Sequence, residues 1–207
     1  MTKKNFLIII FLSLIYFLFY SFSYSYSVSQ ELQENLFRLH IIANSDSEED
    51  QNLKLYVRDK VVEYLHQFTF SSKEELISFL SNNTSNLENV IQSAIHEKGY
   101  SYPFSIEISN SYFPKKNYNN IHLPSGNYDG LKIKIGESRG KNWWCVLFPP
   151  MCLIDSSTCK LPEESTDILE DSITDETLSI ISQDTKPCTF KFKIVDIINN
   201  LCYILTE

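Results

Sequence analysis

A long apolar segment near the amino terminus dominates the hydrophobic pattern of this chain. Residues 6–22 are apolar or aromatic apart from two serines, and two lysines precede them. A basic flank before such a run is typical of an export signal or a membrane anchor, since about 20 residues span a bilayer. Ser25 and Ser27 fit a small-x-small cleavage site. We therefore expect residues 1–29 to be a cleaved signal peptide, with a retained N-terminal membrane anchor as the alternative, and one domain over residues 30–207 outside the cytoplasm.

Three segments after this leader show helical spacing of their apolar residues. Ser47 is a good N-cap, and the acidic residues that follow suit the positive end of a helix dipole, so we expect a helix to about His66. Capping boxes at Ser72 and Ser85 begin two shorter helices, of which the second ends at Gly99. The apolar stripe of the first helix consists of Leu53, Val57, Val61, Leu65 and Phe68.

Strand patterns flank the helices on both sides. Residues 36–43 form a mainly apolar strand before them. After them, apolar and polar residues alternate over residues 104–109 and 131–135, which is typical of half-buried strands. A continuous apolar run over residues 143–149 predicts a strand buried on both faces. Turn-forming residues 136–142 predict a hairpin between the last two strands.

Less regular segments complete the pattern. Residues 31–37 indicate a short helical lead-in, residues 114–127 a polar loop, and the acidic, Ser/Thr-rich residues 155–187 the least ordered part. Residues 190–205 predict a closing strand and an amphipathic helix. We therefore expect an α+β fold: an antiparallel sheet of about four strands with packed helices, preceded by the N-terminal signal or anchor segment.

The block Gly140–Cys152 contains both tryptophans and two of the five cysteines. Cys145 and Cys152 flank a Pro-Pro turn that can bring their Cα atoms within bridging distance, and an exported domain permits disulfides. We therefore predict a Cys145–Cys152 disulfide. The alternative is that all five cysteines are reduced core residues. Alternation along the strand places one indole toward the core and the other outward.

Charge and motifs exclude several classes of function. The formal net charge is −8 and becomes more negative without the leader lysines, so nucleic acid and an anionic membrane surface are poor targets. The membrane is expected to be contacted only through the N-terminal segment. Four scattered histidines match no metal spacing, and no Walker loop, GxSxG, GxGxxG or HExxH motif is present. We expect no catalytic residues, no metal and no cofactor, and a protein partner or a small ligand is the more natural target.

Two of the three arginines stand on predicted elements. Arg38 lies on the first strand and Arg58 on the first long helix. Each is expected either to pair with a carboxylate such as Asp59 or to bind a carboxylate of a partner, because the guanidinium fork matches carboxylate geometry.

Two long blocks carry a family resemblance. The sequences RLHIIANSDSEEDQNLKLYVRDKV over residues 38–61 and SGNYDGLKIKIGESRGKNWWCVLFPPMCLID over residues 125–155 are similar to the hallmark phrases of the stage II sporulation protein R family. The closing KFKIVDII of residues 191–198 resembles the final segment of that family. The serine-tyrosine leader departs from the family pattern, as do the extra cysteines Cys159, Cys188 and Cys202.

The resemblance implies an exported signalling protein rather than an enzyme. Such proteins are made in the forespore and exported into the space between the two septal membranes. There they trigger a membrane-embedded aspartic protease of the mother cell, which processes a pro-sigma factor to its active form. On this basis we expect the chain to bind the extracytoplasmic face of that protease. The candidate contact residues are Arg38, His40, Asn44, Asp46, Arg58, Trp143 and Trp144, since Trp and Arg are favoured interface anchors.

Two other classes of function stay open. A membrane-anchored structural component of sporulation would keep its leader. An exported hydrolase would use His40 with Asp46 or Asp50 as orienting carboxylate and Ser45 as nucleophile, or a Cys145–His40 dyad. A turn and a helix cap also require Ser45 and Asp46, which favours a structural interpretation of these two residues.

Overall fold

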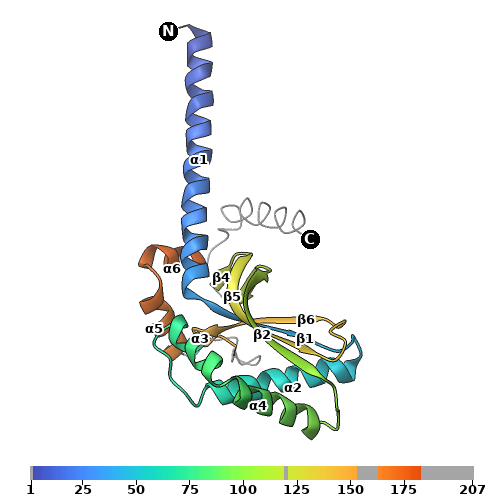
Figure 1. The fold of residues 1–207 in the computed structure, drawn as a ribbon. Coiled ribbons are helices and arrows are strands. Elements are labelled where there is room, and N and C mark those ends of the chain that lie inside the picture. The colour runs from blue at the N-terminus through green and yellow to red at the C-terminus, as the bar shows by residue number, and fades with distance from the viewer. Residues whose placement is uncertain (1, 119–120, 153–162, 183–207) are drawn as a thin grey trace.

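The computed structural model describes residues 2–118, 121–152 and 163–182 (Figure 1). The helices are α1 (Lys3–Asn35), α2 (Glu48–Leu65), α3 (Lys73–Asn82), α4 (Thr84–Glu97), α5 (Glu163–Ser172) and α6 (Asp175–Ile181). The strands are β1 (Phe37–Ile42), β2 (Phe104–Phe113), β3 (Lys116–Tyr118), β4 (Ile121–Leu123), β5 (Gly126–Ile135) and β6 (Asn142–Phe148). The closing strand and helix expected over residues 190–205 lie outside the described residues.

Helix α1 is continuous from the apolar leader into the domain. Its first part is exposed, whereas Val28 and Leu32 near its C-terminal end are buried. Figure 1 shows the helix projecting away from the domain, with only its end near the sheet. The helical lead-in expected over residues 31–37 is therefore the end of this same helix, which stops at Asn35, just before β1 begins.

Strand β1 lies in the interior of the main sheet, whose strand order is β2-β5-β1-β6. Leu39 of β1 stands opposite Leu131 of β5 in a parallel pairing and opposite Cys145 of β6 in an antiparallel pairing. Strand β2 pairs antiparallel with β5. The predicted α+β class and the four strands are confirmed, with one parallel pairing among the antiparallel ones. Residues 136–142 do not form the expected hairpin, because the buried strand β1 occupies the place between β5 and β6.

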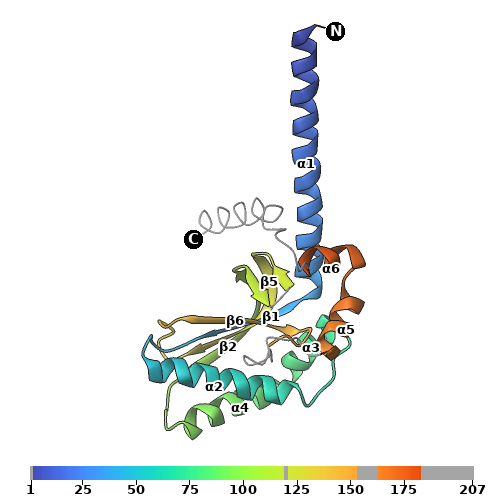
Figure 2. The ribbon, with the colours of Figure 1, turned by 180° about the vertical axis from the view of Figure 1, so that it is seen from behind.

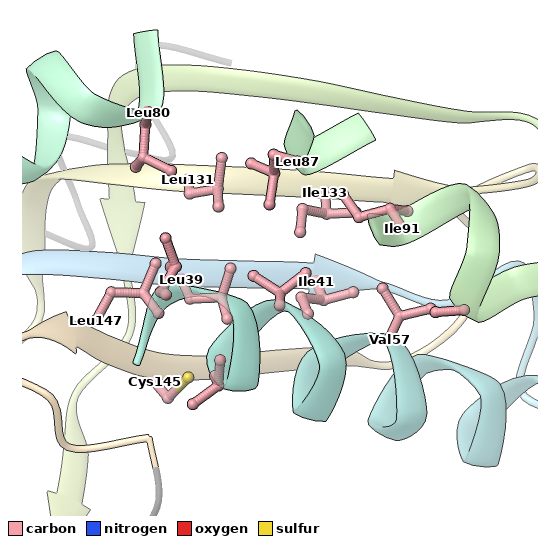
Figure 3. Close-up of a cluster of buried hydrophobic side chains, with 14 of the residues drawn as sticks. Leu39, Ile41, Val57, Leu80, Leu87, Ile91, Leu131, Ile133, Cys145 and Leu147 are labelled. Atoms are coloured by element: carbon pink, nitrogen blue, oxygen red, sulfur yellow. The ribbon is translucent and has the colours of Figure 1, made fainter. Parts of the chain in front are cut away.

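The main core lies between this sheet and helices α2 and α4, which cover the sheet face away from α1 (Figures 1 and 2). In Figure 3, Leu39 and Ile41 of β1 point toward the helices together with Leu131 and Ile133 of β5. The predicted stripe of α2 is buried except for Phe68, which lies beyond the end of the helix and is 41% exposed.

The predicted helix boundaries hold with one exception. The side chain of Ser72 accepts a hydrogen bond from the N–H of Glu75, which is one half of the predicted capping box; the carboxylate of Glu75 accepts from the N–H of Ser71 rather than from that of Ser72. Helix α4, however, begins one residue before Ser85, and its N-cap Asn83 makes no side-chain capping bond. Gly99 follows the end of α4 with a φ of +82°, a conformation that glycine adopts without steric cost.

A second apolar cluster lies on the opposite face of the sheet. Strands β3 and β4 pair as a two-stranded sheet, and their Tyr118, Ile121 and Leu123 side chains are buried against the C-terminal part of α1. The prediction of a polar loop over residues 114–127 was therefore wrong. The apolar side chains of this short segment alternate with polar ones, so one side of it can be buried while the other stays in water.

Helices α5 and α6 belong to the segment that was expected to be the least ordered. Thr174 caps α6, and its backbone N–H also donates to a carboxylate oxygen of Glu31 on α1 at 2.6 Å. Leu169 and Ile180 are buried in the second cluster. For residues 163–182 the structure therefore shows helices where the acidic composition suggested little order, because capping and apolar contacts outweigh that composition. Residues 155–162 and 183–187 of the predicted segment lie outside the described residues.

Cys145 and Cys152 form the predicted disulfide, with their Cα atoms 5.4 Å apart. Cys145 is buried in the main core beside Leu39 and Leu147 (Figure 3). The bridge therefore fixes the turn after β6 to the interior of that strand. Cys159, Cys188 and Cys202 lie outside the described residues.

We expect reduction of this disulfide to lower the free energy of unfolding by about 2 kcal/mol, because the bridge constrains the unfolded chain. Urea unfolding of the wild-type chain with and without dithiothreitol measures the loss. The control is the Cys145→Ala/Cys152→Ala double variant, whose unfolding should not respond to the reductant. A wild-type chain equally stable under both conditions would contradict the prediction.

Candidate functional site

Strand β1 presents two polar side chains on the sheet face opposite α2 and α4. Leu39 and Ile41 point into the main core, so Arg38 and His40 point to the other side, as the two-residue period of a strand requires. Trp144 of β6 stands opposite His40 in the antiparallel pairing. Three of the predicted contact residues therefore meet in one place. We call Arg38, His40 and Trp144 the polar face.

His40 is buried between aromatic rings. Its ring stacks on Trp144 at a centroid distance of 3.6 Å and meets Phe113 edge-on at 6.2 Å. Its Nε2 lies 2.9 Å from Oδ1 of Asn142, which fits a neutral ring that donates from this nitrogen. Burial lowers the pKa of His40 from 6.5 to about 4; the hydrogen bond to Asn142 opposes this, and two nearby lysines add to it. The imidazole is therefore neutral at pH 7.

The guanidinium of Arg38 has no exposed surface. Its Nη1 donates to the carbonyl oxygen of Pro114 at 3.3 Å, while Nε and Nη2 have no hydrogen-bond partner of good geometry among the described residues. Its Cζ lies 4.7 Å from the ring centre of Phe113 and 5.0 Å from that of Tyr128. No carboxylate of the described residues forms an ion pair with Arg38. The carboxylate partner that the sequence suggested is thus not found in this part of the chain.

The contacts of Arg38 do not fully offset the free-energy cost of burying its charge. A desolvated cation–π contact contributes about 2 kcal/mol. Burial of an ion without a counter-charge costs several kcal/mol, even after the protein relaxes around it. The two rings therefore offset part of the cost, and a buried positive charge remains without full compensation.

Tyr118 of β3 completes the surroundings of Arg38, although the sequence did not identify it. Its hydroxyl is buried, and no partner among the described residues lies at the distance and angle of a regular hydrogen bond. Burial raises the pKa of Tyr118 to about 12, and the neighbouring Arg38 cation acts in the opposite direction. The alternation of Tyr118 with polar neighbours was the signal that could have placed it, but the segment was interpreted as a loop.

Arg58 and Trp143 meet on the other side of the sheet. The Cζ of Arg58 lies 4.4 Å from the ring centre of Trp143. Arg58 also forms the expected ion pair with Asp59, at 2.6 Å. Trp143 packs at the edge of the main core, so the two half-buried indoles lie on opposite faces of β6. This pair is separate from the polar face.

Asn44 and Asp46 tie the junction between β1 and α2 to the segment between β5 and β6. Oδ1 of Asn44 accepts from the backbone N–H of Glu137 at 2.9 Å, and Oδ1 of Asp46 accepts from that of Lys141 at 2.7 Å. Nδ2 of Asn44 donates to the carboxylate of Asp50 at 2.8 Å. Both predicted contact residues therefore hold the domain together, whatever else they bind.

Two glycines make this close approach possible. A Cβ on Gly136 would meet the side chain of Asn44, and one on Gly140 would meet the carbonyl oxygen of Ser45. Burial raises the pKa of the Asp50 carboxyl, but hydrogen bonds from Ser45 and Asn44 outweigh this and hold the pKa below its ordinary value. Asp50 is thus an ionised structural acceptor at pH 7.

The described residues do not assemble the catalytic arrangements considered from the sequence. They contain no group of three His, Cys, Asp or Glu that could hold a metal. The Cys145–His40 dyad is excluded, because Cys145 is disulfide-bonded on the helix side of the sheet. The carboxylate of Asp46 accepts from the backbone N–H of Lys141, and that of Asp50 accepts from Ser45, so both are used in structural hydrogen bonds. What the polar face offers is a buried cation, hydrogen-bond donors and stacked rings, which are means of recognition.

The buried neutral His40 makes stability depend on pH. Its pKa is lower in the folded chain than in the unfolded chain, so the stability it contributes is present above pH 6.5 and is lost as the pH falls toward 4. We expect a loss of about 2 kcal/mol between pH 7 and pH 5. Urea unfolding at both pH values measures it. A His40→Gln variant keeps a donor for Asn142 and should lack this part of the pH dependence; equal pH slopes in both chains would refute the assignment.

Comparison with known proteins places this site in a family. Residues 33–158 match the sequence model of stage II sporulation protein R, and this range contains the polar face, the junction and both bridged cysteines. The stage II sporulation protein R of Bacillus subtilis (strain 168) is 33% identical over 138 residues, which cover 66% of this chain and 62% of that relative. No solved structure matches the chain significantly. The chain belongs to the stage II sporulation protein R family.

Proposed function

We propose that this chain is an exported sporulation signal that activates a membrane-embedded aspartic protease of the mother cell, which then processes a pro-sigma factor to its active form. The observation that carries the proposal is the family match over residues 33–158. The pairwise comparison with the Bacillus subtilis relative covers 62% of the length of that protein, whose name assigns it to stage II of sporulation. The activity and the partner are therefore proposed for this chain.

Export into the space between the two septal membranes is supported by the N-terminal helix and the disulfide. Helix α1 is the one helix of the described residues that is long and apolar enough to cross a membrane, and the apolar part is unburied. The Cys145–Cys152 disulfide is typical of compartments outside the cytoplasm. Both features suit a domain that acts on the extracytoplasmic side.

The leader is proposed to remain on the mature protein as an anchor. Ser25 and Ser29 are buried within α1, so cleavage at the small-residue site would cut a helix that is already part of the fold. Glu31 further fixes the end of α1 by accepting hydrogen bonds from Thr174. Tyr20 and Tyr24 stack near the end of the apolar run, where interfacial aromatic residues are expected in a membrane helix.

The polar face lies on the side of the sheet from which α1 emerges, because α2 and α4 cover the other side (Figure 1). A membrane-embedded receptor would therefore meet this side of the domain first. Activation requires the domain to bind the active form of the receptor more tightly than the inactive form, since a ligand shifts an equilibrium only by its differential affinity.

Co-expression of this chain with the receptor protease and the pro-sigma factor in a non-sporulating host tests the function. We expect processing to depend on this chain, as measured by the ratio of mature to precursor sigma factor. A variant that lacks residues 2–22 should remain in the cytoplasm and trigger no processing. Processing in the absence of this chain, or equal processing with the leaderless variant, would remove the proposal.

Retention of the leader is tested on the membrane fraction. We expect the mature chain to keep residues 1–29 and to resist extraction by alkaline carbonate, because α1 is packed as one helix. The intact mass of the purified protein measures this. A Ser25→Ala/Ser27→Ala variant, which offers the alanines preferred at cleavage sites, serves as a control for access of the signal peptidase. A mature wild-type chain that begins between residues 26 and 30 would disprove retention.

A further inference from the structure

Among the described residues, three buried hydrogen-bond donors lie close together beneath the two-stranded sheet β3–β4 without a hydrogen bond of good geometry. They are Nε and Nη2 of Arg38 and the hydroxyl of Tyr118. The hydroxyl oxygen of Tyr118 faces the guanidinium of Arg38, which leaves the hydroxyl hydrogen without an acceptor. Buried polar groups in folded proteins are almost always partnered. A cation and a hydroxyl without acceptors at neighbouring positions are therefore arranged for an acceptor that comes from another molecule.

We propose that Arg38 and Tyr118 form a binding site for one carboxylate of the receptor protease. Nε and Nη2 lie on one edge of the guanidinium and can donate two parallel hydrogen bonds to the two oxygens of a carboxylate. The hydroxyl of Tyr118 supplies a third donor. The inference rests on the proposed function for the identity of the partner, and on the geometry of Arg38 and Tyr118 for the site.

The charge of the site fits a single carboxylate. Arg38 is the buried cation of the site, since His40 on the same face is neutral at pH 7 and the lysines that act on His40, Lys132 and Lys134, are not buried. Phe113 and Tyr128 wall the guanidinium with aromatic rings and bring no further positive charge. A phosphate carries close to two negative charges at neutral pH and would keep an excess charge in this apolar place. A carboxylate balances Arg38.

A ligand can reach Arg38 only if β3–β4 moves aside, because Arg38 has no exposed surface in the closed arrangement. Tyr118 lies on β3, so its hydroxyl donates once the sheet has closed again over the bound carboxylate. Each of these strands has three residues, and a two-stranded sheet of this size has little stability of its own. The sheet β3–β4 lies on the side from which α1 emerges (Figure 1). A carboxylate of a membrane-embedded partner therefore approaches the site from the side where its cover can lift.

Thermal unfolding of the full-length chain in detergent tests the site without the receptor. The probe is acetate, compared with chloride at equal ionic strength. We expect acetate to raise the unfolding temperature of the wild-type chain, since a ligand that binds the folded state stabilises it. The Arg38→Met variant should fold with equal or higher stability, because an apolar side chain replaces an uncompensated charge. Its unfolding temperature should not respond to acetate.

Two further variants make the test specific. Tyr118→Phe removes one donor and one buried unpartnered hydroxyl, so it should fold normally and show a smaller acetate shift. Arg139→Met removes an exposed arginine that pairs with Glu137, and it should leave the acetate shift unchanged. Because Tyr118→Phe alters a single hydroxyl, it keeps the test valid even if Arg38→Met fails to fold.

Capture of the receptor from detergent extracts tests the partner. We expect Arg38→Met to lower capture and pro-sigma processing by roughly tenfold or more, while Arg139→Met stays within about twofold of wild type. Wild-type capture by Arg38→Met, absence of an acetate shift in the wild-type chain, or an equal shift in Arg38→Met would each overturn the site. Processing that needs no copy of this chain would instead refute the proposed function, and with it the receptor as the partner, while the acetate shift would still report on the site.

Discussion

The interior position of β1 between β5 and β6 is the constraint on which the rest of the structure depends. Because β1 has a strand on each side, all of its backbone groups can pair within the sheet, and its side chains divide strictly between two faces. The helix side receives Leu39 and Ile41, which build the main core. The other side receives Arg38 and His40, which the second cluster then has to accommodate.

The sequence predicted well what depends on local periodicity, and less well what depends on long-range pairing. The apolar stripe from Leu53 to Leu65 and the cap at Ser72 depend only on residues close together in the chain. The ends of α2 and α3 were therefore predicted to within a few residues. The insertion of β1 between β5 and β6 depends on contacts far apart in sequence, and a local turn signal at residues 136–142 could not exclude a hairpin. The disulfide was predictable because its two cysteines flank one turn.

The part of the candidate site that depends on local sequence was predicted, and the part that depends on long-range contacts was not. Arg38, His40 and Trp144 stand out as residue types, and the strand period places the first two on one face. Tyr118 did not stand out, because it reaches Arg38 from a segment whose polar composition suggested a loop. The sequence also could not show that no carboxylate of the described residues pairs with Arg38, since the pairing of charges is decided by the tertiary fold. The sequence shows which chemical groups the chain contains, whereas the tertiary fold determines which of these groups come into contact.

The interior place of β1 also sets the order of events during folding. His40 and its partner Asn142 are separated by 102 residues, so the centre of the sheet cannot be completed until most of the chain has been synthesised. Contacts of such high sequence separation form slowly, because loop-closure entropy must be overcome before they stabilise anything. The first strand of the domain therefore waits for the last strand of the main sheet, and a chain that ends before β6 leaves one edge of β1 unpaired.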